Sequence, residues 1–255
     1  MAVGAYVVGV FTVPVDLRPN VFYAVPMNPM IADIQLPLWL ALLFGGLLAA
    51  LIAFLIGWPV LRLRGDYLAI ATLGFSEIIR ILITNAQSWT NGALGIKDIP
   101  ALNDVRYIFI ATAITFLFVT CLINSSYGRA FKAIREDEIA AEAMGVGLFK
   151  HKCMAFMLSA FFAGIGGGLY ATLLGTVDPK NFLFTLTYNF LLIIVLGGMG
   201  SITGSMLGSI IVTGGLEYLR VFDEPLELFG MAIPLFRPGF RMVMFSVLLM
   251  ACVLF

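Results

Sequence analysis

The stretch LWLALLFGGLLAALIAFLIGWPVL (Leu38–Leu61) decides the fold class of this chain. It contains no charged residue and is longer than the ~20 apolar residues that an α-helix needs to cross a bilayer. Trp39 and Trp58 lie near its two ends, where aromatic side chains anchor helices at the membrane interface. Small residues recur at every fourth position, so a neighbouring helix is expected to approach this face closely: Gly45, Ala49, Ala53 and Gly57.

The composition of the whole chain supports the same class of protein. Of its residues 61% are hydrophobic and 12% are charged, and the mean hydropathy of +1.01 excludes a soluble domain. Backbone amides in lipid must be bonded internally, and the ~10-residue alternating pattern of a membrane β-barrel is absent. We therefore expect an all-α fold, a polytopic transmembrane helical bundle with about 6–8 membrane segments, some short or broken.

Further apolar runs lie on both sides of Leu38–Leu61. The run Tyr188–Tyr218 is either one long span or two short ones broken near Gly198–Gly204, where glycines interrupt it. The first and last runs, Met1–Val13 and Gly239–Phe255, are short. We therefore expect a single membrane-spanning domain that is truncated at both ends. The remaining predicted spans are Tyr67–Thr84, Val105–Ile123 and Cys153–Leu174.

Basic residues in the loops predict the orientation of the spans. The loop with Arg62 and Arg64 carries two, and the stretch Asn124–Lys152 carries five. Three other loops carry one each, so alternating spans place the two basic loops together on the cytoplasmic side. The same alternation favours the broken form of 188–218. The loops with one basic residue are 14–37 with Arg18, 85–104 with Lys97 and 175–187 with Lys180.

The stretch Asn124–Lys152 is the long polar block between spans. Within it, the acidic residues at positions 136–138, which suit a helix N-terminus, and a glycine suited to the C′ position predict a short helix from Glu136 or Asp137 to Gly145. Because isolated helices of two turns are marginal in water, something must cover its apolar face. Either the inner surface of the membrane domain covers it, or a groove on a cytoplasmic partner does. This face consists of Ile139, Ala140, Ala143 and Met144.

Two further sets of charged residues each have two interpretations. Glu77 and Arg80 share one helix face inside the predicted span Tyr67–Thr84. They form either a neutralising structural pair or part of a substrate path. The basic residues before the short helix either extend its contact with a partner or hold the loop at the anionic inner leaflet. These basic residues are Arg129, Lys132 and Arg135.

The glycine-rich segment 197–208 predicts close helix packing or a broken helix that lines a translocation path. No Gly-Lys-Ser/Thr follows it, which excludes a phosphate-binding loop. The chain has no convincing nucleophile–base or paired-carboxylate arrangement, its cysteines lack metal-like spacing, and His151 is expected at the solvated surface. We therefore expect no catalytic and no metal site. The glycines are Gly197, Gly198, Gly200, Gly204 and Gly208.

Three segments together resemble one family of membrane proteins. Residues 61–80, 128–168 and 196–208 are similar to the inner-membrane permease of bacterial branched-chain amino acid ABC importers, the LivM type. The family usually has Pro where Ser205 stands, and it normally has further N-terminal helices and a basic C-terminal tail. The segments read LRLRGDYLAIATLGFSEIIR, GRAFKAIREDEIAAEAMGVGLFKHKCMAFMLSAFFAGIGGG and LGGMGSITGSMLG.

The resemblance implies a permease domain over residues 1–255 that imports leucine, isoleucine and valine by alternating access, in a bacterial inner membrane and in contact with its lipid. It implies a second permease of the LivH type, two cytoplasmic ATPases and a periplasmic amino-acid-binding protein as partners, and no nucleic acid. The chain has no Walker motif, so we expect no enzyme activity and no cofactor of its own, with ATP bound by the partners. A urea or short-amide ABC permease and an ion-coupled secondary transporter are the alternatives. The loop 124–152 would couple to the ATPase through Glu138, Ala140, Ala141, Glu142 and Gly145.

Overall fold

A computed structural model describes residues 1–23, 25–63, 65–100 and 105–218, together with the short pieces 227–228, 231–232 and 250. The chain divides into two compact units, Met1–Phe184 and Thr185–Phe255, and each is described by itself. The prediction of one permease domain over residues 1–255 stays a prediction.

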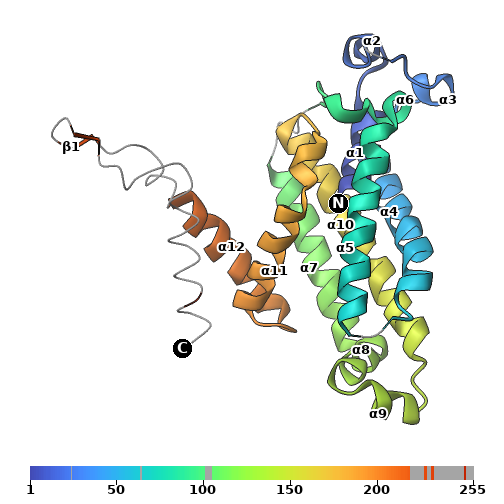
Figure 1. The fold of residues 1–255 in the computed structure, drawn as a ribbon, viewed down its shortest axis with the longest axis vertical. Coiled ribbons are helices and arrows are strands. Elements are labelled where there is room, and N and C mark those ends of the chain that lie inside the picture. Colours follow the sequence, from blue (N-terminus) through green and yellow to red (C-terminus); the bar gives the residue numbers. More distant parts are fainter. Residues whose placement is uncertain are drawn as a thin grey trace. The chain divides into compact units, whose positions relative to one another are not determined.

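Every helix or strand element described in the first unit is a helix (Figure 1). Its four longest helices have 19–27 residues, and shorter helices lie before, between and after them. In chain order the helices are α1 (Ala2–Thr12), η1 (Val15–Leu17), α2 (Arg18–Val21), α3 (Pro29–Ala32), α4 (Leu38–Val60), α5 (Asp66–Asn85), α6 (Gln87–Thr90), η2 (Gly92–Leu94), α7 (Arg106–Asn124), α8 (Ser126–Glu136), α9 (Glu138–Ala143), α10 (Leu148–Leu174) and η3 (Pro179–Phe182).

Among the described residues, α4, α5, α7 and α10 are long and apolar enough to cross a membrane. Each corresponds to a predicted span, although α10 begins at Leu148 and not at Cys153. The helix α1 is apolar but shorter, as expected from the run Met1–Val13. The predicted all-α, polytopic membrane bundle is therefore confirmed.

The core of the first unit lies where α1, α4 and α10 pack together. The predicted small face of α4 is buried at all four positions, from Gly45 to Gly57. A Cβ atom added at Gly4 would overlap the carbonyl oxygen of Gly164, and one added at Gly164 would lie 2.8 Å from Cβ of Ala49. Small residues on all three helices thus permit the close approach that the spacing predicted.

One end of this unit gathers the three loops with a single basic residue. Asn91 donates from Nδ2 to the carbonyl oxygen of Val21 at 2.9 Å, which joins the loop 85–104 to the loop 14–37. Ile96 and Val177 pair as an isolated antiparallel bridge, which joins the loop 85–104 to the segment after α10. These contacts place the three loops together, as the alternation of spans predicted.

A buried arginine fastens the loop 14–37, a role that the sequence did not reveal. Arg18 is 4% exposed and donates from Nε to the carbonyl oxygen of Val13 at 3.2 Å. Its Nη1 and Nη2 donate to the carbonyl oxygens of Ile31 at 2.8 Å and Ile34 at 2.7 Å. Burial lowers the pKa of the Arg18 guanidinium, and the charge of Asp33 acts in the opposite direction.

The opposite end brings the loop after α4 beside the start of α10. Trp58 lies edge-on to Phe149 with ring centroids 5.3 Å apart, and Cζ of Arg62 lies 5.6 Å from the centroid of each ring. Figure 1 shows α8 and α9 at this same end. The two strongly basic loops therefore share one end, as their charges predicted.

The predicted break is confirmed: α11 (Phe184–Gly197), which belongs to the second unit from Thr185 on, and α12 (Ile202–Tyr218) are separate helices. Gly198 and Gly200 have φ values of 87° and 92°, which glycine adopts without strain and which end the first helix. The two-residue strands β1 (Glu227–Leu228) and β2 (Met231–Ala232) pair antiparallel. The predicted last apolar run, 239–255, lies outside the described residues except for residue 250.

Candidate coupling surface formed by α8 and α9

The helix α8 was not predicted from the sequence, and it carries the basic half of the candidate surface. Its apolar residues Tyr127 and Phe131 lie beside His151 of α10, with ring centroids 6.4 Å and 6.2 Å apart, and Ile134 is buried. His151 is thus half-buried between helices, whereas the sequence predicted a solvated position. The apolar spacing 127, 131 and 134 is the signal that could have revealed an amphipathic helix. The exposed face carries Arg129, Lys132 and Arg135.

The helix α9 begins where one of the two predicted starts placed it. Asp137 is the N-cap, and its Oδ1 accepts from the backbone N–H groups of Ile139 at 2.8 Å and Ala140 at 3.0 Å. The first helical residue is therefore Glu138. Because the extended backbone of Asp137 also ends α8, this one residue sets the corner between the two helices.

The helix α9 ends in a Schellman motif at Gly145. The N–H of Gly145 donates to the carbonyl oxygen of Glu142 at 2.9 Å, and that of Val146 donates to Ala141 at 3.0 Å. Gly145 has a φ of 83°, which disfavours a side chain even though a Cβ atom added there would meet no atom within 4 Å. Glycine is thus required at position 145 by the backbone conformation of the turn, and not by a lack of room for a side chain.

Two contacts attach α9 to the rest of the first unit. Lys152 Nζ lies 2.6 Å from Oε1 of Glu138, and so the first residue of α9 is tied to α10. Ala141 is 4% exposed and faces inward. Of the predicted coupling residues, these two positions hold the helix, whereas Ala140, Glu142 and Gly145 face outward.

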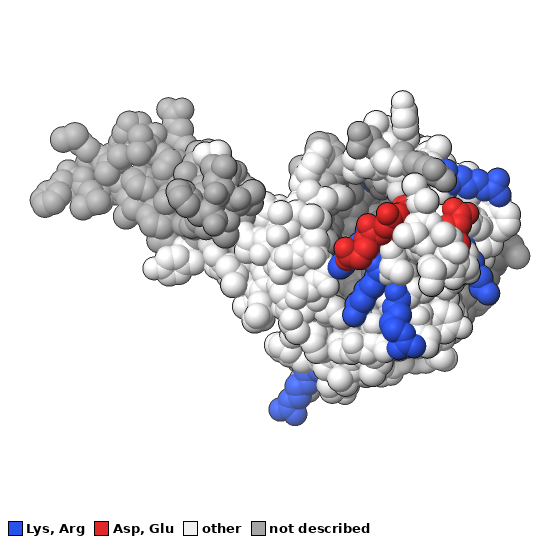
Figure 2. Space-filling model, turned by 90° about the horizontal axis from the view of Figure 1, so that it is seen from below, with Lys and Arg blue, Asp and Glu red and all other residues white. Residues whose placement is uncertain are grey.

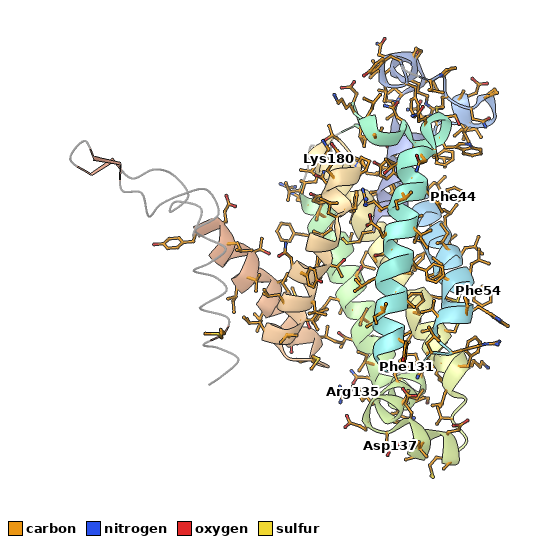
Figure 3. The ribbon with its side chains drawn as sticks, in the orientation of Figure 1. Phe44, Phe54, Phe131, Arg135, Asp137 and Lys180 are labelled. Atoms are coloured by element: carbon orange, nitrogen blue, oxygen red, sulfur yellow. The ribbon has the colours of Figure 1, made fainter. Side chains whose placement is uncertain are left out.

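The apolar face of α9 is largely uncovered by the described residues. Ile139 is 78% exposed and Met144 is 84% exposed, so the inner surface of the first unit does not cover them. Basic and acidic side chains gather around this end of the unit (Figure 2). Figure 3 labels Arg135 and Asp137 here and Lys180 at the opposite end. An exposed apolar helix with charged surroundings can dock into a groove on another protein.

The predicted intramembrane pair lies on α5, away from this corner. Arg80 donates from Nε to Oε1 of Glu77 at 2.9 Å, and both side chains are partly exposed. Each charge therefore has its partner on the same helix, whatever surrounds α5 in the assembled protein. A role in a substrate path stays a prediction.

The predicted glycines of the second unit divide into two geometries. A Cβ atom at Gly197 would overlap the carbonyl oxygen of Gly204, and one at Gly204 would overlap that of Gly197. A Cβ atom at Gly208 would lie 3.1 Å from Cα of Gly197. These three glycines bring α11 and α12 together, whereas Gly198 and Gly200 form the turn between them. Whether any of them lines a path stays a prediction.

Comparison with known proteins decides the family. Residues 1–254 match the family described as "Branched-chain amino acid transport system / permease component". The chain belongs to this permease family. Permeases of this family are membrane proteins, and the four long apolar helices accord with a multi-pass membrane protein. The resemblance drawn from the three sequence segments is thereby confirmed.

Several curated permeases are similar to this chain. It is 39% identical over 220 residues to the high-affinity branched-chain amino acid transport system permease protein LivM of Escherichia coli K12, over 73% of this chain and 52% of that protein. It is 27% identical over 201 residues to LivH of the same organism, over 68% of this chain and 63% of LivH. It is 26% identical over 228 residues to the guanosine ABC transporter permease protein NupQ of Bacillus subtilis 168, over 81% of this chain and 69% of NupQ. The chain spans about half the length of LivM of Escherichia coli K12 and of Salmonella typhimurium LT2, and no solved structure matches it.

Proposed function

We propose that this chain is a membrane-spanning subunit of an ATP-binding-cassette importer for branched-chain amino acids. The observation that supports it most is the family match, which extends from residue 1 to residue 254. The LivM relatives, which the chain resembles at up to 39% identity, favour leucine, isoleucine and valine as substrates over urea or short amides. The subunit transports and performs no chemistry of its own.

The proposed mechanism uses α9 as the contact with a cytoplasmic ATPase. Ile139 and Met144 present apolar side chains outward, and a complementary groove on the ATPase would bury them. The ion pair between Glu138 and Lys152 then transmits a displacement of α9 to α10, which forms part of the core. Closure of two ATPases around ATP would rock the permease subunits and open a central path by alternating access.

The partners follow from the same proposal. A second permease of the LivH type would complete the path, two ATPases would bind and hydrolyse ATP, and a periplasmic binding protein would deliver the amino acid. The end of the first unit with α8 and α9 would face the cytoplasm, because it carries the loops rich in Lys and Arg. The membrane would be the bacterial inner membrane.

Uptake of labelled leucine tests the proposal directly. The chain is reconstituted into vesicles with the second permease, the ATPases and the binding protein, and uptake is measured with and without ATP. Unlabelled isoleucine and valine should compete, whereas urea and guanosine should not. If guanosine is taken up in an ATP-dependent manner and leucine is not, the substrate belongs to the class of the guanosine permease among the relatives.

Co-purification tests the coupling mechanism separately. The ATPase should purify with the wild-type chain, and Gly145→Trp should abolish ATP-driven uptake because it disrupts the end of α9. If the chain purifies from membranes without an ATPase and Gly145→Trp leaves uptake intact, an ion-coupled transporter becomes the better explanation.

A further inference from the structure

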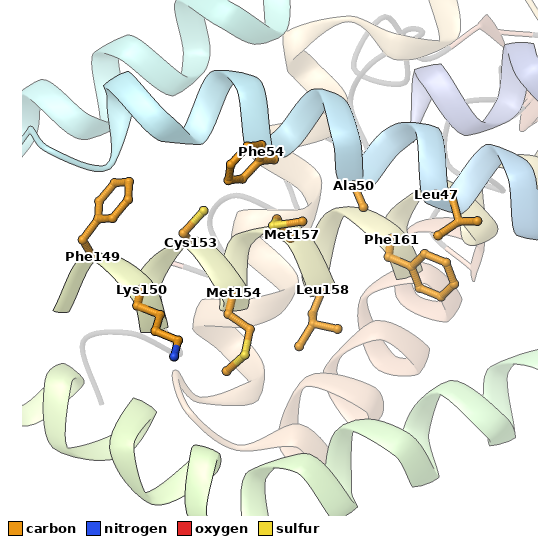
Figure 4. Close-up of a pocket in the computed structure, with 10 residues that line it drawn as sticks. All are labelled: Leu47, Ala50, Phe54, Phe149, Lys150, Cys153, Met154, Met157, Leu158 and Phe161. Carbon is orange, nitrogen blue, oxygen red and sulfur yellow. The ribbon is translucent and has the colours of Figure 1, made fainter. Parts of the chain in front are cut away.

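An apolar groove of about 520 Å³ runs along the surface of the first unit between α4 and α10 (Figure 4). Its walls include Phe54 of α4 and Met154, Leu158 and Phe161 of α10. These large side chains are only partly buried, so the first unit by itself leaves them accessible. The groove has no part in the coupling surface described above.

The groove has one charged lining residue, Lys150, at its end. Among the described residues Lys150 is exposed and makes no ion pair, whereas Lys152 is paired with Glu138. Arg62 brings a second positive charge to this end, because its Cζ lies 5.6 Å from the ring centroid of Phe149, which also lines the groove. Two other grooves of the first unit, of about 420 and 440 Å³, are lined without any charged side chain.

The length of the groove fits one leaflet of a bilayer. Lys150 and Phe161 are separated by about 16 Å of helix axis, at 1.5 Å per residue. Half of the hydrocarbon core of a bilayer is about 15 Å thick. Trp58 lies beside Phe149 at the same end as Lys150, which is where an aromatic anchor marks the membrane interface. The charged end therefore corresponds to the depth of lipid headgroups, and the far end to the bilayer centre.

We propose that this groove binds one acyl chain of an anionic phospholipid whose headgroup lies at Lys150 and Arg62. The acyl chain contacts the apolar walls of the groove, and the negatively charged headgroup, which includes the phosphate, neutralises the charge of Lys150. The site selects anionic over zwitterionic lipids, because a zwitterionic headgroup brings no net charge to the two cations. Lipid binding in this groove depends neither on ATPase docking nor on the transported substrate.

Fluorescence quenching tests the lipid site in the full chain. Trp39 and Trp89 are replaced by Phe, which leaves Trp58 as the only tryptophan. The chain is reconstituted into vesicles that contain increasing mole fractions of either brominated phosphatidylglycerol or brominated phosphatidylcholine. We expect phosphatidylglycerol to quench Trp58 at lower mole fraction, and Lys150→Ala to reduce this preference roughly fivefold.

Matched variants separate charge from folding. Lys150→Arg should keep the preference, and Lys180→Ala should not alter it, because Lys180 is exposed at the opposite end of the unit. Ala50→Phe fills the groove without changing charge and should weaken quenching by phosphatidylglycerol. Equal quenching by both lipids in the wild type, or an unchanged preference in Lys150→Ala, would overturn the proposal.

A photo-crosslink in cell membranes distinguishes lipid from protein as the occupant. Benzoylphenylalanine at Met154 points its reactive group at whatever lies in the groove. The expected product is a phospholipid adduct of the chain, with anionic headgroups enriched over their share in the membrane. A protein adduct as the main product would show that another subunit covers the groove and would contradict the proposal.

Discussion

Lys152 and Glu138 join the start of α9 to the first turns of α10, with Nζ and Oε1 2.6 Å apart. The rest of α9 and its terminal turn lie between the two residues in the chain, so the ion pair closes a loop that contains the exposed helix. Their side chains are 21% and 44% exposed, and solvent therefore weakens the attraction. The pair positions α9 against α10 in the first unit, while the outer face of α9 stays exposed.

Removing one partner of this pair should loosen α9 without unfolding the bundle. For Lys152→Met we expect amide hydrogen exchange in α9 to become about twofold to fivefold faster, which corresponds to about 0.5–1 kcal/mol for a partly exposed pair. Exchange in α4 should not change. The exchanged pair Glu138→Lys with Lys152→Glu should recover most of the protection, and Lys150→Met should have no effect on α9. If amide exchange in α9 of Lys152→Met is as slow as in the wild type, Ala141 alone fixes the helix.

A substitution at Gly145 should be tolerated according to how readily the new residue adopts a positive φ, and not according to the size of its side chain. Its φ of 83° costs an L side chain about 1–2 kcal/mol, whereas no neighbouring atom opposes the side chain itself. ATP-driven leucine uptake should therefore fall in the order Gly145→Asn, Gly145→Ala, Gly145→Val, because Asn adopts this conformation most readily. Gly147, with a φ of −69° and equally open surroundings, provides the control: Gly147→Ala should leave uptake unchanged.

The exposed side chains of α9 should affect partner binding and not stability. Ile139→Glu and Met144→Glu replace residues that are 78% and 84% exposed, so the thermal stability of the chain should change by about 0.5 kcal/mol or less. Co-purification of the ATPase should nevertheless be lost. A matched change at the buried Ile134 of α8, Ile134→Glu, should lower stability instead. Full ATPase recovery with both α9 variants would remove this face from the proposed contact.

Much of this architecture follows from local patterns in the sequence. Length and hydropathy predict the span Leu38–Leu61, and helical spacing predicts the ion pair of Glu77 with Arg80. Each of these signals lies within a single segment of the sequence. The role of Arg18 depends on carbonyl groups of Ile31 and Ile34, which are brought together only by the folded loop. Backbone acceptors leave no mark in a sequence, so this role could not be predicted.

The helix α8 is hard to predict for a different reason. Its charged residues are typical of a polar loop, and its helical character is visible only in the spacing of three apolar side chains, Tyr127, Phe131 and Ile134. Exposure of Ile139 and Met144 also required the structure, because the sequence shows that α9 has an apolar face but not whether the rest of the chain covers it.

The contact between α11 and α12 should depend on the absence of side chains at Gly204. A Cβ there would overlap the carbonyl oxygen of Gly197, so Gly204→Ala should destabilise the second unit by about 1–3 kcal/mol, as overpacking does elsewhere. Gly214 lies on the same helix with no atom within 4 Å, and Gly214→Ala should be neutral or slightly stabilising. Thermal melting of the purified chain in detergent, compared between the two variants, measures the difference. Equal melting temperatures would contradict this close approach.

The pair Glu77 and Arg80 should matter for assembly more than for selectivity. Glu77→Ala leaves Arg80 without its partner inside a predicted span, and an unpaired charge in hydrocarbon is costly. The yield of assembled complex should therefore fall, while the relative uptake of leucine, isoleucine and valine should stay the same. Removing both charges, in Glu77→Ala with Arg80→Ala, should restore part of the yield, because no lone charge then remains. Normal yield of Glu77→Ala with altered preference among the three amino acids would instead place the pair on the substrate path.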